Sequence, residues 1–216
     1  MLIQTKGKNI VIDTGPDFRQ QLLKVNIPRL DGVVFTHSHR DHLSGFDDIR
    51  AFNYLQKEKI KVYLEEDVMS AIRRDYFYMF EQFKYPGVPE ADFHIIDETQ
   101  FSIDDIHIRP IRVHHYQMPV LGFRIDNFTY ITDANSISDK EIEKIKGTEV
   151  LVLNALRRES HISHFSLDEA IEMVNRINPK KAYFTHISHQ LGLHEDVNLE
   201  LPETIQLAWD GLTVNL

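Results

Sequence analysis

The feature that most constrains this chain is a group of metal-binding side chains within residues 37–42, which read His-Ser-His-Arg-Asp-His. They follow the apolar segment 31–35, which is short enough to be a buried strand. Alternate residues leaving a strand end can point into one cavity, so we expect His37 and His39 to hold one metal ion. Asp41 and His42 would reach a second ion about 3.5–4 Å away. A histidine-rich polar loop is the alternative, and the carboxylate among the imidazoles argues against it.

Composition narrows the class of protein. The chain has 216 residues, of which 42% are hydrophobic and 26% charged, as in ordinary globular proteins with a sizeable core. It contains no cysteine, which excludes disulfides and thiolate metal sites within the chain. The formal net charge of −9 argues against a broad surface for nucleic acid, so we do not expect RNA as a partner. No apolar run approaches the roughly 20 residues of a membrane span and no signal peptide is visible, so we expect no membrane partner and a cytoplasmic location.

The motif at 37–42 resembles the signature of the metallo-β-lactamase superfamily, whose α/β fold is a four-layer αββα sandwich with a metal site along one edge. Two further segments, 15–19 (Gly-Pro-Asp-Phe-Arg) and 45–50 (Gly-Phe-Asp-Asp-Ile-Arg), are similar to the PhnP-like phosphoribosyl 1,2-cyclic phosphate phosphodiesterases. Members of that branch begin earlier, with a strand, a Gly-Thr-Gly turn and a cysteine-bearing loop. We therefore expect residues 1–216 to form a single domain whose N-terminal strand region is truncated.

The resemblance implies three more metal ligands downstream. In the PhnP-like branch the third ligand stands seven residues before the glycine of a Pro-Val-Leu-Gly-Phe-Arg segment, and counting back from Gly122 gives His115. Asp133 and His186 each follow an apolar, strand-like segment, where the resemblance places the remaining two ligands. Asp133 could instead cap a loop, but its two carboxylate oxygens suit a bridge between two ions. The full expected set is His37, His39 and His115 on one ion, Asp41, His42 and His186 on the other, and Asp133 between them.

Two further residues have expected roles in this centre. His164 lies just before a helix that Ser166 would cap, and the matching histidine of the family contacts the substrate phosphate and acts as general acid. A surface-loop histidine is the open alternative. Asp13 closes an apolar segment and is either a turn residue or a neighbour that orients a ligand. His189 matches a histidine that joins the cysteines of some relatives in a structural zinc site, and without cysteines we expect it to bind no metal.

These residues predict a dinuclear metal-dependent hydrolase, with catalysis depending on Asp41 and His164. The expected substrate is a small or cyclic phosphodiester, attacked through a metal-bridging hydroxide. The expected cofactors are two divalent ions, zinc or manganese, with iron possible, since imidazole and carboxylate suit all three. A hydrolase of another bond, such as a thioester, lactone or lactam, is one alternative. An inactive metal-binding fragment is the other.

Several elements can be predicted outside the metal motif. Segments 2–5 and 9–13 are expected to form a hairpin, whose exposed edge at 2–5 would favour a homodimer. Helices are predicted over 46–57 and over the aromatic segment 65–83, which is read as core or as a lid over the site. Segments 204–209 and 212–216 are expected to form a final strand pair around an Asp-Gly turn.

Overall fold

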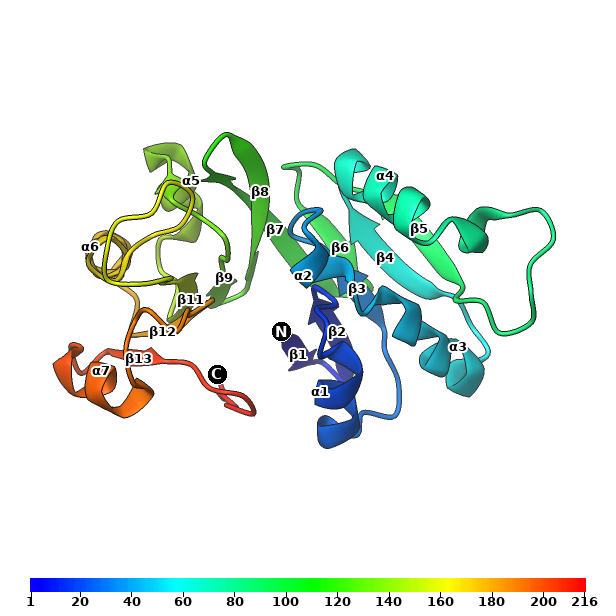
Figure 1. Cartoon of the computed structure of the whole chain (residues 1–216), viewed down its shortest axis with the longest axis horizontal. Helices are drawn as coiled ribbons and strands as arrows, with labels where there is room; N and C mark the ends of the chain where they lie inside the picture. Colours follow the sequence, from blue (N-terminus) through cyan, green and yellow to red (C-terminus); the bar gives the residue numbers. More distant parts are fainter. The chain divides into compact units, whose positions relative to one another are not determined.

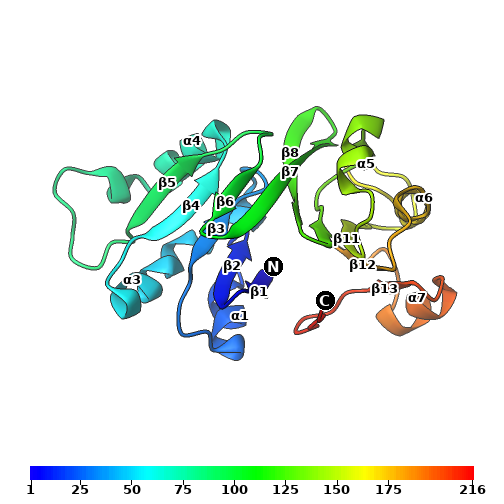
Figure 2. The same cartoon turned by 180° about the vertical axis from the view of Figure 1, so that it is seen from behind.

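The computed structural model describes residues 1–216, and its contacts divide into two compact units, Met1–Ile106 and His107–Leu216. Each unit contains strands joined into a sheet together with several helices (Figures 1 and 2). This mixed α/β content, with two sheets and helices, matches the predicted fold class. The single domain over 1–216 stays a prediction, because a division of contacts does not decide it. No helix combines the length and the apolar character needed to span a bilayer.

The first unit is organised around a five-stranded sheet with the order β1-β2-β3-β4-β5. The strands are β1(Leu2–Thr5), β2(Lys8–Ile12), β3(Gly32–Val34), β4(Ile60–Leu64) and β5(Ala91–Ile95), and β6(Phe101–Ile103) lies near the end of the unit. β1 and β2 form the predicted antiparallel hairpin, with positive φ at Lys6 and Gly7 in the turn. β2 to β5 run parallel, so their carboxyl ends meet at one edge of the sheet. The segments that carry Asp13 and His37 both leave from this edge.

Helices cover one face of this sheet (Figures 1 and 2). The α-helices and 3₁₀ helices (η) of the first unit are α1(Phe18–Val25), α2(Arg40–Leu43), η1(Phe46–Ile49), α3(Arg50–Gln56), α4(Glu66–Asp75) and η2(Phe77–Phe80). Their apolar side chains, such as Phe46 and Ile72, are fully buried against alternate strand residues such as Val33 and Val62. α2 and η1 follow the end of β3 directly, so this core fixes the position of the metal motif.

Two helical predictions in the first unit need correction. The helix expected over 46–57 begins with the 3₁₀ turn η1, and only Arg50–Gln56 is α-helical. The helix expected over 65–83 ends at Asp75, because Tyr76 leaves the helical conformation with φ −121° and ψ 38°. The Tyr76 hydroxyl donates a hydrogen bond to the carbonyl of Leu43 at 2.7 Å, a tertiary contact that local helix propensity does not contain.

The aromatic residues of this segment are divided between core and surface. Tyr76, Tyr78 and Phe80 pack against the core of the first unit, whereas Phe77 and Phe83 are 60% and 88% exposed. The interpretation of the segment as core is therefore correct only for its inward-facing members.

The second unit is built on a sheet with the strand path β10-β7-β8-β9-β11-β12-β13. The strands are β7(Ile106–His115), β8(Met118–Ile125), β9(Phe128–Tyr130), β10(Ser136–Ile137), β11(Val150–Asn154), β12(Lys181–Thr185) and β13(Ile205–Leu207). β7, β8 and β9 are antiparallel neighbours, and β9, β11, β12 and β13 run parallel. The parallel part again brings carboxyl ends together, at Thr132-Asp133 and at His186.

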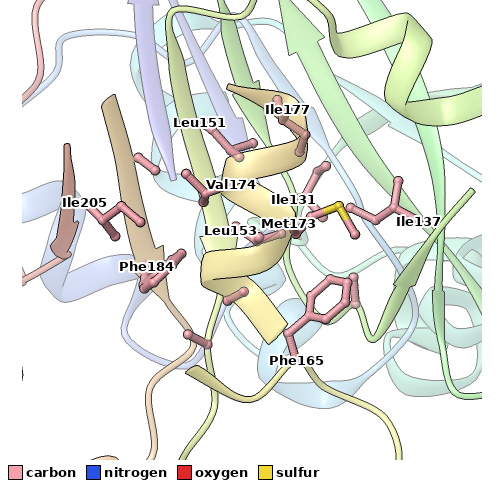
Figure 3. Packing of buried hydrophobic residues seen from close by; sticks show 14 of the residues in the cluster. Ile131, Ile137, Leu151, Leu153, Phe165, Met173, Val174, Ile177, Phe184 and Ile205 are labelled. Atoms are coloured by element: carbon pink, nitrogen blue, oxygen red, sulfur yellow. The ribbon is translucent and has the colours of Figure 1, made fainter. Parts of the chain in front are cut away.

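The helices of the second unit are α5(Asp139–Ile145), α6(Leu167–Ile177) and α7(His194–Glu200). Figure 3 shows α6 with Val174 near Leu151 and Leu153 and with Met173 near Ile131 and Ile137, all residues of one buried apolar cluster. The predicted capping box at the start of α6 is confirmed: the Ser166 hydroxyl accepts from the Glu169 N–H, and the Glu169 carboxylate accepts from the Ser166 N–H at 2.8 Å. This cap fixes the loop that contains His164.

The C-terminal prediction is partly wrong. β13 covers part of the predicted strand 204–209, but it pairs in parallel with β12, and segment 212–216 forms no strand. Most residues of 212–216 are exposed, so they bury no apolar face that would order a strand. The sequence analysis also missed α1 and α7, which are short helices with few buried residues.

Candidate metal centre

The first-unit cluster consists of His37, His39, Asp41 and His42, which the turn after β3 and the start of α2 bring together. The ring centroid of His37 lies 4.7 Å from that of His39 and 4.2 Å from that of His42. Nε2 of His42 lies 3.2 Å from a carboxylate oxygen of Asp41. His37 and His42 are buried, while Asp41 is exposed. Three imidazoles and one carboxylate therefore converge on a small volume, as the motif predicted.

Asp13 holds the orientation of two of these histidines. Its carboxylate accepts the Thr36 N–H at 2.9 Å and the Thr36 hydroxyl at 2.8 Å, and lies 2.7 Å from Nδ1 of His42. A carboxylate only accepts, so Nδ1 of His42 carries the proton and Nε2 carries the lone pair. The Thr36 hydroxyl gives its single proton to Asp13, so it accepts from Nδ1 of His37 at 2.9 Å. Both histidines thus present Nε2 as a metal-binding nitrogen, because the hydrogen bond at Nδ1 fixes the tautomer and the orientation of each ring.

Backbone strain gathers at the strand ends of both units. Asp13, Asp133 and His186 each follow a strand and have φ values of 59°, 55° and 54°. The left-handed region is costly for residues other than glycine, by roughly 1–3 kcal/mol each, and such residues concentrate at functional sites. Here the strain turns each side chain away from its strand direction at the edge where the parallel strands end.

Two glycines allow the first-unit cluster to pack tightly. A Cβ on Gly45 would stand 2.4 Å from the carbonyl oxygen of Gly15, and a Cβ on Gly15 would stand 2.7 Å from the carbonyl oxygen of Asp41. Neither distance is compatible with a side chain. The segments 15–19 and 45–50, which carry the resemblance, are therefore in direct backbone contact beside the metal motif.

The second-unit cluster consists of His115, Asp133, His164 and His186. Nδ1 of His115, at the end of β7, donates to the carbonyl of Ser163 at 2.8 Å, which leaves Nε2 as its metal-binding nitrogen. One oxygen of the buried Asp133 accepts the Thr132 hydroxyl at 2.6 Å and lies 3.0 Å from Nδ1 of His186. One donor atom from each of His115, Asp133 and His164 lies within 4.8 Å of the others, close enough to hold an ion together.

His164 is enclosed by the other imidazoles of this cluster. Its ring centroid lies 4.4 Å from that of His115 and 4.8 Å from that of His186, on which it stacks. It is 8% exposed, so the surface-loop alternative does not describe it. Its Nε2 is buried without a hydrogen-bond partner, and the nearest acid is the Asp133 carboxylate at 3.6 Å. A buried nitrogen in this position can exchange a proton or a ligand at the site.

The loop before His164 holds residues that the sequence analysis did not single out as functional. Nδ1 of His161 lies 3.2 Å from Nδ1 of His164, and the Ser163 hydroxyl lies 3.1 Å from the same nitrogen of His164. Desolvation, then His164 and the Arg157 guanidinium, lower the pKa of His161, so this ring favours its neutral form. The spacing His-x-x-His was visible in the sequence, but nothing local showed that the two rings would meet.

Three further histidines, His114, His189 and His194, lie outside both clusters. His189 is exposed in the loop after β12. His194 begins α7, where Nε2 contacts the Leu207 carbonyl at 3.3 Å. His114 is exposed next to the less accessible His115, because successive side chains of a strand point to opposite faces.

The donor atoms of both clusters fit a divalent metal. Imidazole nitrogen and carboxylate oxygen are ligands that zinc, manganese and iron(II) accept, and three imidazoles are already held by hydrogen bonds in the tautomer that leaves Nε2 for a metal. No thiolate competes, since the chain has no cysteine.

A sequence model described as the β-lactamase superfamily domain matches residues 8–187, a range that includes every member of both clusters. The chain therefore belongs to the metallo-β-lactamase superfamily. Within this superfamily, the chain is 32% identical to a crystal structure described as a new diphosphatase from the PhnP family. The match covers 100% of this chain and 83% of that chain, with a TM-score of 0.92, and confirms the resemblance to the PhnP branch.

Two other relatives define the breadth of the similarity. A Porphyromonas gingivalis protein named octanoyltransferase is 36% identical over 214 residues, which are 98% of this chain and 43% of that protein. The chain thus spans less than half the length of this curated relative. The Zn²⁺-bound structure of PqqB from Methylobacterium extorquens is 15% identical with a TM-score of 0.77, over 100% of this chain and 86% of that one. That likeness shows the shared fold alone.

Proposed function

We propose that the chain is a phosphodiesterase that uses two divalent ions to cleave a small or cyclic phosphodiester. The observation that carries this proposal is the 32% identity, over the whole chain, with a protein described as a PhnP-family diphosphatase. A diphosphatase also breaks a phosphorus–oxygen bond, so the two activities need the same kind of site. The prepared imidazoles of both clusters support the metal part of the proposal.

The proposed ligand assignment takes side chains from both units. His37, His39 and His115 would hold one ion, Asp41, His42 and His186 the other, and Asp133 would contact both. Zinc or manganese are the proposed metals, with iron as a further candidate. When bound, two such ions lower the pKa of a coordinated water and neutralise charge on phosphoryl oxygens.

The side chains of the protein have distinct tasks in this scheme. Asp13 and Thr36 keep Nε2 of His37 and His42 directed at the ligand position. The carbonyl of Ser163 does the same for His115. The buried Nε2 of His164, next to Asp133, is placed to give a proton to the departing oxygen of the substrate, which general acid catalysis requires.

The first test is hydrolysis of a chromogenic phosphodiester and of the matching monoester, after loading with zinc or manganese. We expect the wild-type chain to cleave the diester, and Asp41→Ala to lose this activity because the second ion loses a ligand. Asp67→Ala, which changes an exposed acid in the first turn of α4 outside the cluster, is the matched control. Absence of diester cleavage in a chain that binds about two metals would contradict the proposal.

A second candidate is hydrolysis of an acyl thioester. It is favoured by one observation, the similarity to the P. gingivalis protein named octanoyltransferase. The match covers only 43% of the P. gingivalis protein, so the acyl chemistry in its name need not lie in the matched part. An octanoyl thioester offered to the same metal-loaded preparation distinguishes the two: release of thiol without diester cleavage would favour the second candidate.

The expected partners and location stay predictions. We propose a small phosphodiester as substrate, without RNA or a membrane as partner, and a cytoplasmic location. A homodimer through β1, which lies at the edge of the first sheet, is proposed from its unpaired edge. Sedimentation that shows only monomer at high micromolar concentration would contradict the dimer.

A further inference from the structure

The loop that ends at His164 brings two imidazoles into contact through the same kind of nitrogen. Nδ1 of His161 and Nδ1 of His164 lie 3.2 Å apart, with ring centroids 5.2 Å apart. The Ser163 hydroxyl lies 3.1 Å from Nδ1 of His164 and 3.3 Å from Nδ1 of His161. Three polar groups therefore share one small region on the side of His164 opposite to Nε2.

The donors in this region can be assigned. The Ser163 N–H donates to Nδ1 of His161 at 3.4 Å, and a backbone N–H can only donate, so Nδ1 of His161 is an acceptor. The proton in the contact between the two rings must then be on Nδ1 of His164. The Ser163 hydroxyl fits this assignment, because it can accept from Nδ1 of His164 and donate to Nδ1 of His161. Nδ1 of His161 has one lone pair, and its shortest contact is with Nδ1 of His164 at 3.2 Å, while the two Ser163 donors lie farther away at 3.3 and 3.4 Å.

We propose that His161 is a positioning residue that holds the Nδ1–H of His164, so that Nε2 of His164 faces the leaving oxygen of the substrate. This inference rests on the proposed phosphodiesterase function. A general acid that gives up its Nε2 proton keeps its Nδ1 proton, so an acceptor at Nδ1 suits His164 before and after the transfer. His161 would take the part that a carboxylate takes in other acid–base pairs.

The surrounding loop is suited to hold His161 in place. The Arg157 guanidinium donates to the carbonyls of Ser160 and Glu159 at 3.0 and 3.3 Å, just before His161. On the other side, the Phe165 N–H donates to the Ala134 carbonyl at 2.8 Å, next to Asp133. The neutral form that His161 favours leaves Nδ1 able to accept.

The test compares two phosphodiesters with different leaving groups, 4-nitrophenolate and a simple alkoxide. An alkoxide is strongly basic and must be protonated as it leaves, whereas 4-nitrophenolate is a weak base that leaves without a proton. We therefore expect His161→Ala to reduce kcat for the alkyl diester by about 10–100-fold, with a change of less than about threefold for the nitrophenyl diester. His161→Asn places an amide oxygen near the position of Nδ1 and is expected to restore most of the alkyl activity. His189→Ala, an exposed histidine outside the site, is the matched control.

A second measurement does not depend on activity. Long-range ¹H–¹⁵N spectra of the metal-free protein distinguish Nδ1–H from Nε2–H in neutral histidine, and His164→Gln identifies the signals of His164. We expect the Nδ1–H form in wild type and in His161→Asn, and a shift toward Nε2–H in His161→Ala. Metal content, measured by elemental analysis, should stay unchanged in both variants.

The outcomes separate this inference from the proposed function. Equal losses on both diesters, no loss on either, or an Nε2–H form of His164 in wild type would each overturn the positioning role. A wild-type chain that cleaves neither diester would instead contradict the proposed function, while the nitrogen spectra would still decide whether His161 holds His164.

Discussion

At the scale of single residues, Asp13 is connected to the metal motif both directly, through His42, and indirectly, through Thr36. It receives the Thr36 N–H and hydroxyl and lies 2.7 Å from Nδ1 of His42. Its left-handed φ of 59° lets the side chain turn toward these partners as the chain leaves β2. The sequence left open whether Asp13 was a turn residue or an orienting neighbour, and in the structure its carboxylate contacts Thr36 and His42, as an orienting neighbour would.

Asp13→Asn is expected to weaken metal binding without removing a ligand. The carboxylate of Asp13 accepts through both of its oxygens. The amide of Asn keeps only one oxygen, and its NH₂ group is a donor, so it cannot accept from Thr36 and His42 together. Loss of such an outer partner typically lowers metal affinity by about 10–100-fold. Competitive titration with a metal indicator measures the affinity. Asp31→Asn, which changes another buried aspartate at the start of β3, is the control, and equal affinities for Asp13→Asn and wild type would contradict the orienting role.

His164→Ala tests whether this residue moves a proton or binds an ion. Under the proposed function, the variant keeps its metal content and loses about 10²–10⁴-fold in kcat on a diester with an alkoxide leaving group. The alternative is that His115, Asp133 and His164 hold an ion together, since their donor atoms lie within 4.8 Å of one another. Elemental analysis after gel filtration separates the two, because a drop in bound metal would identify His164 as a ligand.

At the scale of elements, the close contact between the turn after β2 and the turn before η1 fixes the metal motif. The N–H of Gly45 donates to the Thr14 carbonyl at 2.8 Å, and the N–H of Thr14 donates to the His42 carbonyl at 2.8 Å. These bonds connect the ends of β2 and α2 directly, so a change that separates the two turns would also move Asp13 away from His42.

Gly45→Ala is expected to separate them. Its Cβ would stand 2.4 Å from the Gly15 carbonyl oxygen and 2.7 Å from Cβ of Phe18, and neither atom lies at the end of a flexible side chain. Overpacking of this kind costs about 1–3 kcal/mol. Gly87→Ala is the control, since nothing lies within 4 Å of its Cβ and only its φ of 90° is strained. Urea unfolding should show the larger loss for Gly45→Ala, accompanied by weaker metal binding that Gly87→Ala does not show.

The elements also show what the sequence could predict. Strands such as β4, β11 and β12 were identifiable because continuous or alternating apolar residues mark them, and α6 because Ser166 and Glu169 form its cap within four residues. The end of α4 at Asp75 was missed because a tertiary contact of Tyr76 decides it. The strand at 212–216 was wrongly predicted, since its turn signal and apolar residues lack a buried face.

In the site too, residues that form a local sequence pattern could be predicted, and residues that act through tertiary contacts could not. Residues 37–42 could be recognised because the motif is continuous in sequence, whereas His115, Asp133 and His186 depended on a family resemblance. Thr36, Ser163 and His161 were missed as functional residues, because their importance lies in hydrogen bonds to other side chains and not in a pattern along the chain. Residues that orient an imidazole ring can be recognised only from the structure, because their hydrogen bonds join residues that form no pattern in the sequence.

At the scale of the whole molecule, neither unit alone offers a full set of ligands for the proposed centre. In the proposed assignment, the first unit would supply two ligands to each ion, His37 and His39 to one, Asp41 and His42 to the other. Zinc sites in enzymes use three protein ligands and an open position. The proposed assignment takes the remaining ligands from His115, His186 and the carboxylate of Asp133.

Metal binding should consequently stabilise the whole chain and depend on ligands from both units. An ion that binds only the folded state adds about 2.7 kcal/mol to the free energy of unfolding when its free concentration is about 100 times its Kd. We expect the thermal midpoint of the chelator-treated protein to rise when zinc or manganese is restored. His37→Ala and His115→Ala change one proposed ligand in each unit, and each should reduce this rise. His94→Ala, which changes a histidine of β5 outside both clusters, should not. A rise that His115→Ala leaves intact would mean that the first unit binds its ion without the second, and the proposed assignment would have to be divided between two separate sites.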